Sequence, residues 1–383
     1  MRISSVEALA IRIPTPGKGE DTPPVDTHGR YYIDRSAFVS IYSKDIETTV
    51  VRIRTEDGTT GYGEAQAPIA PRVNKAIIED IVRPLVMGRD PFDAEAVWTR
   101  CYGAMRERGH PTGFYVDALA GVDLALYDIM GKATGKPAHR LIGGRYRDTV
   151  QTYAGIGGTD PKNVAEEAAE HTGYGYRALK LHLLLDRDRV VEIVRAVRER
   201  VGPSIQLMVD VHTRHTVPGA IELGRHLEKL DVRWLESPVV PEDISGQAEI
   251  ARALDMPVAI GEWSRTRYEM REAFERRAFD IVMPDIARTG FTEGKRIAAL
   301  ADTYNIPISP HIGRGGIISV AASVQYSAAI PNFILLEHSH HDHAIKQAIL
   351  RRPYGPVNGS FPVTDAPGLG LEISDSALEK YAI

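Results

Sequence analysis

The amino-acid sequence predicts an α/β protein in which a closed TIM-type barrel follows an N-terminal α+β unit. After residue 148 the chain alternates strictly between short β-branched runs and helix-length amphipathic segments, which is typical of parallel β–α units. Eight such runs at roughly even spacing favour a closed barrel over an open sheet. Before them, a strand meander and three helical patterns predict a smaller unit of different construction.

The N-terminal unit is expected to contain three strands followed by three helices. The sequence Glu-Asp-Gly at 56–58 favours a hairpin turn between the second and third strands. The third helical pattern is apolar around much of its circumference, so this helix should be deeply buried. The predicted strands cover residues 1–13, 48–55 and 61–65, and the predicted helices cover residues 71–87, 91–107 and 114–132.

A long loop is predicted at residues 14–36, which are rich in Pro, Gly, Asp and Thr. Loops of this length in compact domains are usually functional lids or disordered segments. The cationic and aromatic residues of this one, including Arg30, Tyr31 and Tyr32, favour a lid that contacts a substrate.

The barrel and its C-terminal extension complete the chain. Residues 356–383 return to Gly/Pro turns and one short strand, and we expect them to pack back on the N-terminal unit. We therefore divide the chain into residues 1–130, a barrel at 131–355 and the tail. The eight barrel strands are expected at residues 149–155, 177–183, 205–211, 232–236, 257–261, 279–283, 306–310 and 333–336.

The composition describes an ordinary globular protein. The 383 residues are 43% hydrophobic and 25% charged with a net charge of −5, so no basic surface favours nucleic acid or an anionic membrane. The single cysteine, Cys101, excludes an internal disulfide and suits a reducing cytoplasm. The sequence contains no apolar run long enough to span a bilayer and no signal-peptide core. We expect a cytoplasmic protein whose partner is a small molecule.

Charged side chains stand at the C-terminal ends of the predicted strands, where barrel enzymes place their chemistry. In the largely apolar run 207–213, Asp210 and His212 are two residues apart and would share one face of a strand. The acids Asp210, Glu236 and Glu262 are separated by 26 residues each (236 − 210 and 262 − 236). Three converging carboxylates would repel one another, and a hard cation such as Mg²⁺ removes that conflict.

A second pair of side chains is predicted on neighbouring strands. His311 follows the run Pro307–Pro310 and Asp285 follows Met283-Pro284, so both would lie at strand ends. A carboxylate bonded to one ring nitrogen of a histidine fixes the tautomer and raises the basicity of the other nitrogen. The sequence therefore predicts a His–Asp general base.

Together these motifs resemble the enolase superfamily and, within it, the mandelate racemase subgroup. The resemblance covers nearly the whole chain and implies a modified TIM barrel, (β/α)₇β, an α+β capping domain and an essential Mg²⁺. It implies one shared step, the removal of the proton α to a substrate carboxylate. The matching motifs are Lys180-Leu-His182, Val209-Asp-Val-His212, Leu235-Glu-Ser-Pro238, Ile260-Gly-Glu262, Met283-Pro-Asp285, Ser309-Pro-His311 and Leu336-Glu337.

The resemblance also assigns roles to these residues. It implies that Asp285 and His311 form the dyad and that Glu337 hydrogen-bonds the substrate carboxylate. The metal ligands that it implies are Asp210, Glu236 and Glu262.

Two departures from the subgroup pattern narrow the choice of reaction and substrate. The usual Lys-x-Lys becomes Lys180-Leu-His182, so His182 would have to serve if a base is needed on that face. Lys180 is either a cation for the substrate carboxylate or a salt-bridge partner in the barrel, and both interpretations stay open. The Asp-x-His at 210–212 resembles galactonate and mannonate dehydratases, where the histidine is the general acid for the departing hydroxyl. The chain lacks the long insert of mannonate dehydratases, and galactonate dehydratases lack a lysine at the position of Lys180, so neither substrate carries over.

We therefore expect an Mg²⁺-dependent acid-sugar dehydratase. His311 would remove the α-proton and His212 would protonate the leaving 3-hydroxyl, giving a 2-keto-3-deoxy acid. The alternative within the superfamily is an epimerase, racemase or cycloisomerase that uses Lys180 or His182 on the opposite face. A Schiff-base aldolase at Lys180 leaves the three carboxylates without a purpose, and a non-catalytic sugar-acid binder would not need the complete ligand set.

Further contacts are assigned to residues that follow strand ends. Arg288, Trp263 and His338 are expected to contact the sugar-acid substrate. A histidine-rich stretch continues after the last strand, and we interpret it as a polar loop and not as a metal cluster. Its members are His338, His340, His341 and His343. A homo-oligomer is expected.

Overall fold

The computed structural model describes residues 1–15, 27–28, 31–34 and 40–383. The N-terminal unit contains the predicted antiparallel meander, with the strand order β1-β5-β6. A second small sheet follows the order β2-β3-β4. The strands are β1 (Ile3–Ile13), β2 (Thr27–His28), β3 (Tyr31–Asp34), β4 (Ser40–Ser43), β5 (Ile46–Thr55) and β6 (Thr60–Ala65).

The helices of this unit match the three predicted helical patterns. The first is continuous but passes through a π-helical turn at its centre. The third, α4, is buried along most of its length and packs directly on β6. A Cβ at Gly63 of β6 would overlap the carbonyl of Gly121, so glycine permits this close approach. The elements are α1 (Pro71–Ala76), η1 (Ile77–Val82), α2 (Arg83–Val86), η2 (Pro91–Asp93), α3 (Ala94–Arg106) and α4 (Phe114–Thr134).

The barrel strands pair in parallel in the order β12-β11-β10-β9-β8-β7-β13. The strand expected at 306–310 is reduced to single bridges, because Ile308 pairs with Val282 on one side and Phe333 on the other. Pro307 and Pro310 flank Ile308 and lack the N–H donors that a longer ladder needs. These bridges close the ring. The strands are β7 (Thr149–Gly157), β8 (Ala178–His182), β9 (Gln206–Asp210), β10 (Val232–Glu236), β11 (Val258–Ile260), β12 (Ile281–Val282) and β13 (Leu336–His338).

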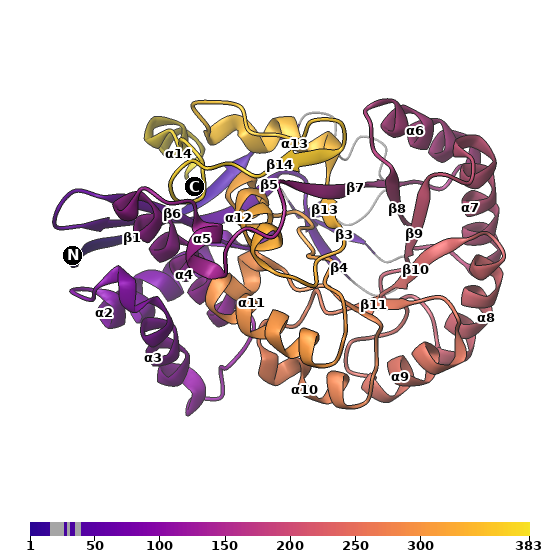
Figure 1. Ribbon diagram of the computed structural model, residues 1–383, viewed down its shortest axis with the longest axis horizontal. Helices are drawn as coiled ribbons and strands as arrows, with labels where there is room; N and C mark the ends of the chain where they lie inside the picture. The colour runs from indigo at the N-terminus through magenta and orange to yellow at the C-terminus, as the bar shows by residue number, and fades with distance from the viewer. Residues whose placement is uncertain (16–26, 29–30, 35–39) are drawn as a thin grey trace.

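One helix follows each of the first seven barrel strands, which gives the expected (β/α)₇β order. Figure 1 shows α6 to α10 as an arc around the strands, with the N-terminal unit at the other end of the molecule. The helices are α6 (Pro161–Gly173), α7 (Arg187–Val201), α8 (Val217–Glu228), α9 (Ile244–Ala253), α10 (Arg267–Glu275), α11 (Ile286–Thr303) and α12 (Ile317–Ala329).

The interior of the barrel is a packed layer of side chains, with at least one from nearly every strand. Successive inward positions on a strand are two residues apart. Ala178, Met208 and Trp234 belong to this layer, so Lys180, Asp210 and Glu236 lie one step nearer the C-terminal ends of their strands. The other members of the layer are Tyr153, Ala259, Ile281, Met283 and Leu335.

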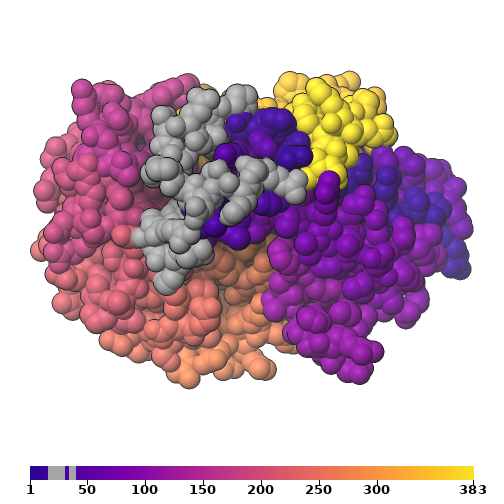
Figure 2. Space-filling view, turned by 180° about the vertical axis from the view of Figure 1, so that it is seen from behind, coloured from indigo at the N-terminus to yellow at the C-terminus, as the bar shows by residue number. Residues whose placement is uncertain are grey.

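The C-terminal segment returns to the N-terminal unit. Figure 2 shows it in yellow against the indigo and purple N-terminal residues. The guanidinium of Arg52 on β5 contacts Asp375 of α14 and Glu7 of β1, each at 2.6 Å. The domain limits at 130 and 355 stay a prediction. The remaining elements are α5 (Ala138–Ile142), α13 (His340–Lys346), η3 (Gln347–Ile349), β14 (Ser360–Pro362) and α14 (Asp375–Tyr381). Across the residues described, no helix has the length and apolar character that crossing a membrane requires.

Candidate active site

The three predicted metal ligands lie at the ends of three adjacent strands. Asp210 and Glu236 end β9 and β10 and are paired in register. Glu262 follows β11 after Gly261, whose φ of 126° turns the chain at the strand end. The three residues are only 3%, 0% and 5% exposed, respectively. Such buried carboxylates need a cation close by.

Lys180 supplies part of that positive charge. Its Nζ lies 2.7 Å from Glu236 Oε1, 2.9 Å from Glu337 Oε1 and 3.6 Å from Asp210 Oδ2. Burial alone would lower the pKa of the Lys180 ammonium, but these carboxylates raise it well above its usual range. Burial together with the neighbouring acids raises the pKa of Glu236, against the attraction of Lys180.

The predicted His–Asp pair is formed. His311 Nδ1 lies 2.8 Å from Asp285 Oδ2, and the other oxygen of Asp285 accepts a hydrogen bond from the Ala287 N–H at the start of α11. The opposite ring nitrogen, Nε2, lies 2.8 Å from Glu262 Oε2. Burial would lower the pKa of His311, but Glu337, Glu262 and Asp285 raise it well above its usual value.

Glu337 closes the ring of acids from the last strand. Its Oε2 accepts hydrogen bonds from the backbone N–H groups of Ile312 and Gly313, at 2.7 and 2.9 Å. Burial alone would raise the pKa of Glu337, but Lys180, His311 and these N–H groups hold it well below its usual range. The acid is therefore fixed in its ionised form between Lys180 and His311.

His212 reaches the site by a route that the sequence pattern did not predict. The strand ends at Asp210, so Asp210 and His212 do not share a strand face. His212 and Thr213 have φ values of 42° and 65°, and the His212 N–H donates to Asp210 Oδ1 at 2.9 Å. This tight turn places His212 Nδ1 3.7 Å from Glu262 Oε1. The expectation that His212 lies near the acids holds, but the reason given for it was wrong.

Two further predicted residues line the same edge. The ring of His212 lies 5.4 Å from that of His182 and 5.7 Å from that of Trp263, centroid to centroid. His182 Nε2 is 3.8 Å from Asp210 Oδ2, and its side chain is 44% exposed. His182, His212 and Trp263 therefore form one aromatic wall beside the acids.

The donor set suits a divalent cation. The carboxylates at the strand ends outnumber the cationic groups Lys180, His311 and Arg288, which leaves an excess of buried negative charge. Oxygen donors from three carboxylates are the ligands that hard divalent ions prefer. Donor atoms of His182, Asp210 and His212 also lie within 4.8 Å of one another, a mixed nitrogen and oxygen set that shares Asp210. In chain order, the five carboxylates are those of Asp210, Glu236, Glu262, Asp285 and Glu337.

The other residues that were expected to contact the substrate lie in different surroundings. Arg288 donates to Gln66 Oε1 of the N-terminal unit and to the Glu262 carbonyl at 3.2 Å, so it joins that unit to the site. The Tyr31 hydroxyl donates to Glu47 Oε2 and accepts from the Ala70 N–H, each at 2.9 Å. Tyr32 stacks on Tyr42 with ring centroids 5.5 Å apart. Arg30 and most of the predicted lid, residues 14–36, lie outside the described residues.

His338 differs from its predicted role. Its Nδ1 lies 2.6 Å from the Tyr176 hydroxyl and its Nε2 lies 3.1 Å from His343 Nδ1, and the residue is 1% exposed. The alternation of β13 explains this, because Glu337 points into the barrel and its neighbour must point outward. Both ring nitrogens are occupied by protein groups, so His338 has none to offer a substrate.

Sequence reasoning missed buried polar residues around the site. Glu64 accepts hydrogen bonds from Gly316 N–H and from Ser319 N–H, the latter at 2.9 Å, at the start of α12. Gln66 donates to the Ile312 carbonyl at 3.0 Å. The ring of Tyr153 lies 5.4 Å from Lys180 Nζ and forms the floor. The sequence feature that could have identified Glu64 is the presence of an acid within the predicted strand Gly61–Ala65.

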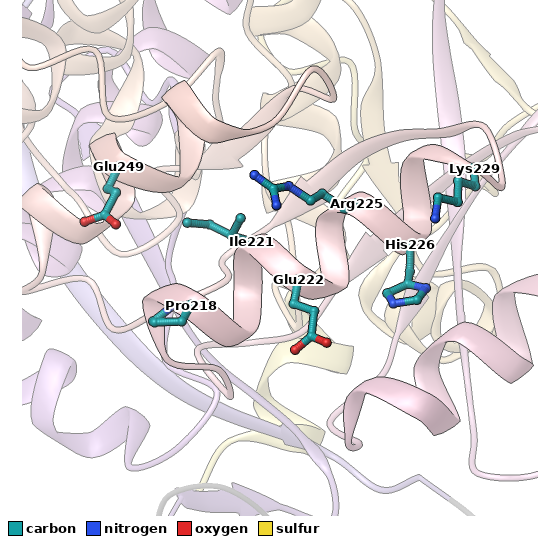
Figure 3. A pocket seen from close by; sticks show the side chains of 7 residues that line it. All are labelled: Pro218, Ile221, Glu222, Arg225, His226, Lys229 and Glu249. Atoms are coloured by element: carbon teal, nitrogen blue, oxygen red, sulfur yellow. The ribbon is translucent and has the colours of Figure 1, made fainter.

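A separate hollow of about 440 Å³ lies on the outer surface of the barrel between α8 and α9 (Figure 3). Its lining consists of one exposed face of α8 and Glu249 of α9, and it contains none of the residues discussed above. It therefore belongs to the outer helical layer. The lining residues are Pro218, Ile221, Glu222, Arg225, His226, Lys229 and Glu249.

Comparisons with known proteins agree with this architecture. Residues 37–143 match the "Mandelate racemase / muconate lactonizing enzyme, N-terminal domain" family, and residues 163–377 match "Enolase C-terminal domain-like". A D-galactarolactone cycloisomerase from Agrobacterium fabrum is 36% identical over 347 residues, covering 87% of this chain and 90% of that protein. A D-xylonate dehydratase from Haloferax volcanii is 32% identical over 369 residues, covering 88% of each. A crystal structure of an enolase superfamily member from Agrobacterium tumefaciens has a TM-score of 0.89 at 30% identity, covering 99% of this chain and 98% of that one.

Proposed function

Because this chain belongs to the mandelate racemase and muconate lactonizing enzyme family of the enolase superfamily, we propose that it is an Mg²⁺-dependent sugar-acid dehydratase. One observation carries the proposal. The carboxylate of Glu262 lies between two histidines, with His311 Nε2 2.8 Å from one oxygen and His212 Nδ1 3.7 Å from the other. A base and an acid that follow the ends of different strands therefore flank the same group and can address adjacent carbon atoms of one substrate.

Asp210, Glu236 and Glu262 would hold the cation. When bound, it supplies positive charge where the substrate carboxylate becomes an enediolate, which lowers the barrier to removing the α-proton. Lys180 Nζ contacts Glu236 and Glu337, so it can place a second positive charge beside the substrate carboxylate. We assign Lys180 this binding role.

His311 takes the α-proton. Asp285 holds the Nδ1–H, so once Nε2 has given up its own proton, the lone pair left on Nε2 faces the acids at the strand ends. The C2–H bond breaks and its electrons form the enediolate. Glu337, fixed by two backbone N–H groups and Lys180, lies 3.7 Å from Nε2 and would face the substrate carboxylate beside Lys180.

His212 completes the elimination. Hydroxide is a poor leaving group, so the 3-hydroxyl needs a proton as the C3–O bond breaks. His212 gives that proton, one water leaves, and the resulting enol gains a proton at C3 to become a 2-keto-3-deoxy acid. No oxidant or reductant is required. His182 and Trp263, packed beside His212, would contact the sugar hydroxyls.

A cycloisomerase is the second candidate, and the 36% identity to a D-galactarolactone cycloisomerase favours it. Its first step is the same α-proton removal, but a ring oxygen leaves in place of hydroxide. The product then keeps the mass of the substrate, whereas a dehydration product is lighter by one water.

A substrate panel tests both candidates. The Mg²⁺-loaded enzyme would be incubated with sugar monoacids, diacids and their lactones, and the products analysed by mass spectrometry and by NMR in D₂O. We expect a 2-keto-3-deoxy acid from at least one acid. A product of unchanged mass from a lactone alone would establish the second candidate, and the absence of α-proton exchange with every compound would refute both.

A further inference from the structure

A second group of possible metal ligands lies outside the barrel, between α6 and α13. Donor atoms of Glu167, His171 and His341 all lie within 4.8 Å of one another. Glu167 and His171 are four residues apart on α6 and share one face of that helix, whereas His341 is in the first turn of α13. None of the three belongs to the site at the strand ends.

The hydrogen bonding of His171 leaves one of its ring nitrogens available to bind a metal ion. The residue is 0% exposed, and its Nδ1 lies 2.9 Å from the backbone carbonyl of Glu167. Because a carbonyl only accepts, Nδ1 must carry the proton and Nε2 must carry the lone pair. Metal-binding histidines are commonly fixed in this way by a carbonyl on the other nitrogen. Within the described residues, this buried Nε2 has no hydrogen-bond partner.

The other two donors face the same space. His341 Nε2 lies 3.0 Å from Glu167 Oε1, and the ring of His341 is 4.9 Å from that of His171. Glu167 is partly buried, with its side chain 24% exposed, and His341 is 57% exposed. A buried imidazole with one unpartnered nitrogen, a carboxylate and a solvent-facing imidazole therefore lie together where an ion can enter from solvent.

The rest of the histidine-rich stretch does not take part. His338 and His343 hydrogen-bond each other at 3.1 Å, and His343 Nε2 lies 2.7 Å from the Tyr354 carbonyl. His340 stacks on Tyr174 with ring centroids 4.5 Å apart. The stretch predicted as a polar loop is instead the end of β13 and the helix α13, and His341 is its member that lies with both Glu167 and His171.

We propose that Glu167, His171 and His341 form a binding site for Zn²⁺. Two neutral imidazoles and one carboxylate are a common zinc ligand set, and water completes the tetrahedron. Hard cations such as Mg²⁺ prefer all-oxygen sites, so the two sites would select different metals. The ion would link α13 to α6. Because α13 starts two residues after β13, this link would also restrain the strand that carries Glu337.

Zinc binding can be measured on the Mg²⁺-loaded protein. Four proteins would be dialysed against ZnCl₂ in excess Mg²⁺ and their zinc content measured by mass spectrometry: wild type, His341→Ala, Glu167→Gln and the control His110→Ala, which removes an exposed histidine elsewhere. Any zinc that binds at the strand ends should be present in equal amount in all four proteins. We expect wild type and the control to hold one more Zn²⁺ per chain than the other two variants. Equal zinc content in all four overturns the proposal.

Two further measurements separate ligation from general stability. Zn²⁺ should raise the melting temperature of wild type and His110→Ala but not of His341→Ala, and a rise in His341→Ala would contradict the site. His341→Cys should restore zinc binding, since thiolate is also a zinc ligand. Loaded with Co²⁺, His341→Cys should show a thiolate charge-transfer absorption that wild type lacks. The absence of that band would place the ion elsewhere.

Discussion

Replacing Asp285 with Asn tests the proposed general base with little change in shape. Asp285 makes two directional contacts, since Oδ1 accepts from the Ala287 N–H at 2.9 Å and Oδ2 lies 2.8 Å from His311 Nδ1. In Asp285→Asn the amide oxygen must keep facing Ala287, because the N–H there can only donate. The NH₂ group is then directed at His311 Nδ1, which must become the acceptor. The ring proton moves to Nε2, where the base needs its lone pair.

The size of the effect follows from this tautomer change. General base catalysis contributes about 10²- to 10⁴-fold, so we expect kcat for α-proton removal to fall by that factor. The free energy of unfolding should hardly change, because Asn and Asp cap helices about equally well. Asp285→Ala would also lose the cap at a cost of about 1 kcal/mol.

The assay is α-proton exchange in D₂O, followed by NMR on a substrate that the panel identifies, together with melting temperatures. Asp243→Asn is the matched control, because Asp243 caps α9 through a 2.8 Å hydrogen bond from the Gly246 N–H and is not among the active-site residues. The control should exchange at the wild-type rate. An Asp285→Asn enzyme that exchanges within a few-fold of wild type would refute the dyad as the base.

Three further predictions concern the rest of the site. EDTA should abolish turnover and Mg²⁺ should restore it, whereas full activity in the metal-free protein would contradict the metal assignment. His212→Asn should lose keto-acid formation but keep α-proton exchange, and both can be measured by NMR. The control is His226→Asn, on the outer face of α8. If His212→Asn dehydrates at a near-wild-type rate, another residue is the general acid. Tyr31→Ala and Tyr32→Ala should change the order of preference across a sugar-acid panel with bound Mg²⁺ unchanged, and an unchanged order would place specificity elsewhere.

The sequence was sufficient to predict the barrel and the identity of the residues at its strand ends. Their positions follow from two short-range rules, the alternation of side chains and the placement of chemistry at the C-terminal ends of parallel strands. These rules place Lys180, Asp210 and Glu236 above the apolar layer of the interior. The same alternation shows that Glu337 and its neighbour His338 point in opposite directions, so the error over His338 was avoidable.

Other features depended on contacts that no local pattern contains. His212 adopts a left-handed backbone in a turn held by Asp210, which a strand pattern cannot predict. The histidine-rich stretch looked uniform in sequence, yet only His341 meets Glu167 and His171, which lie some 170 residues earlier on α6 (341 − 171 = 170). Which histidines meet an acid is decided by how helices pack on the barrel.

The position of Lys180 also helps to distinguish a dehydratase from a Schiff-base aldolase. A Schiff-base lysine must be neutral to attack a carbonyl, which barrel enzymes achieve by placing it among apolar or cationic groups. Lys180 is instead held at 2.7 and 2.9 Å by Glu236 and Glu337, with Asp210 at 3.6 Å. These acids stabilise the ammonium and direct it into their own cluster. The carboxylates that suit a divalent cation therefore also keep the lysine charged, which favours a binding role and argues against both an aldolase and a lysine base.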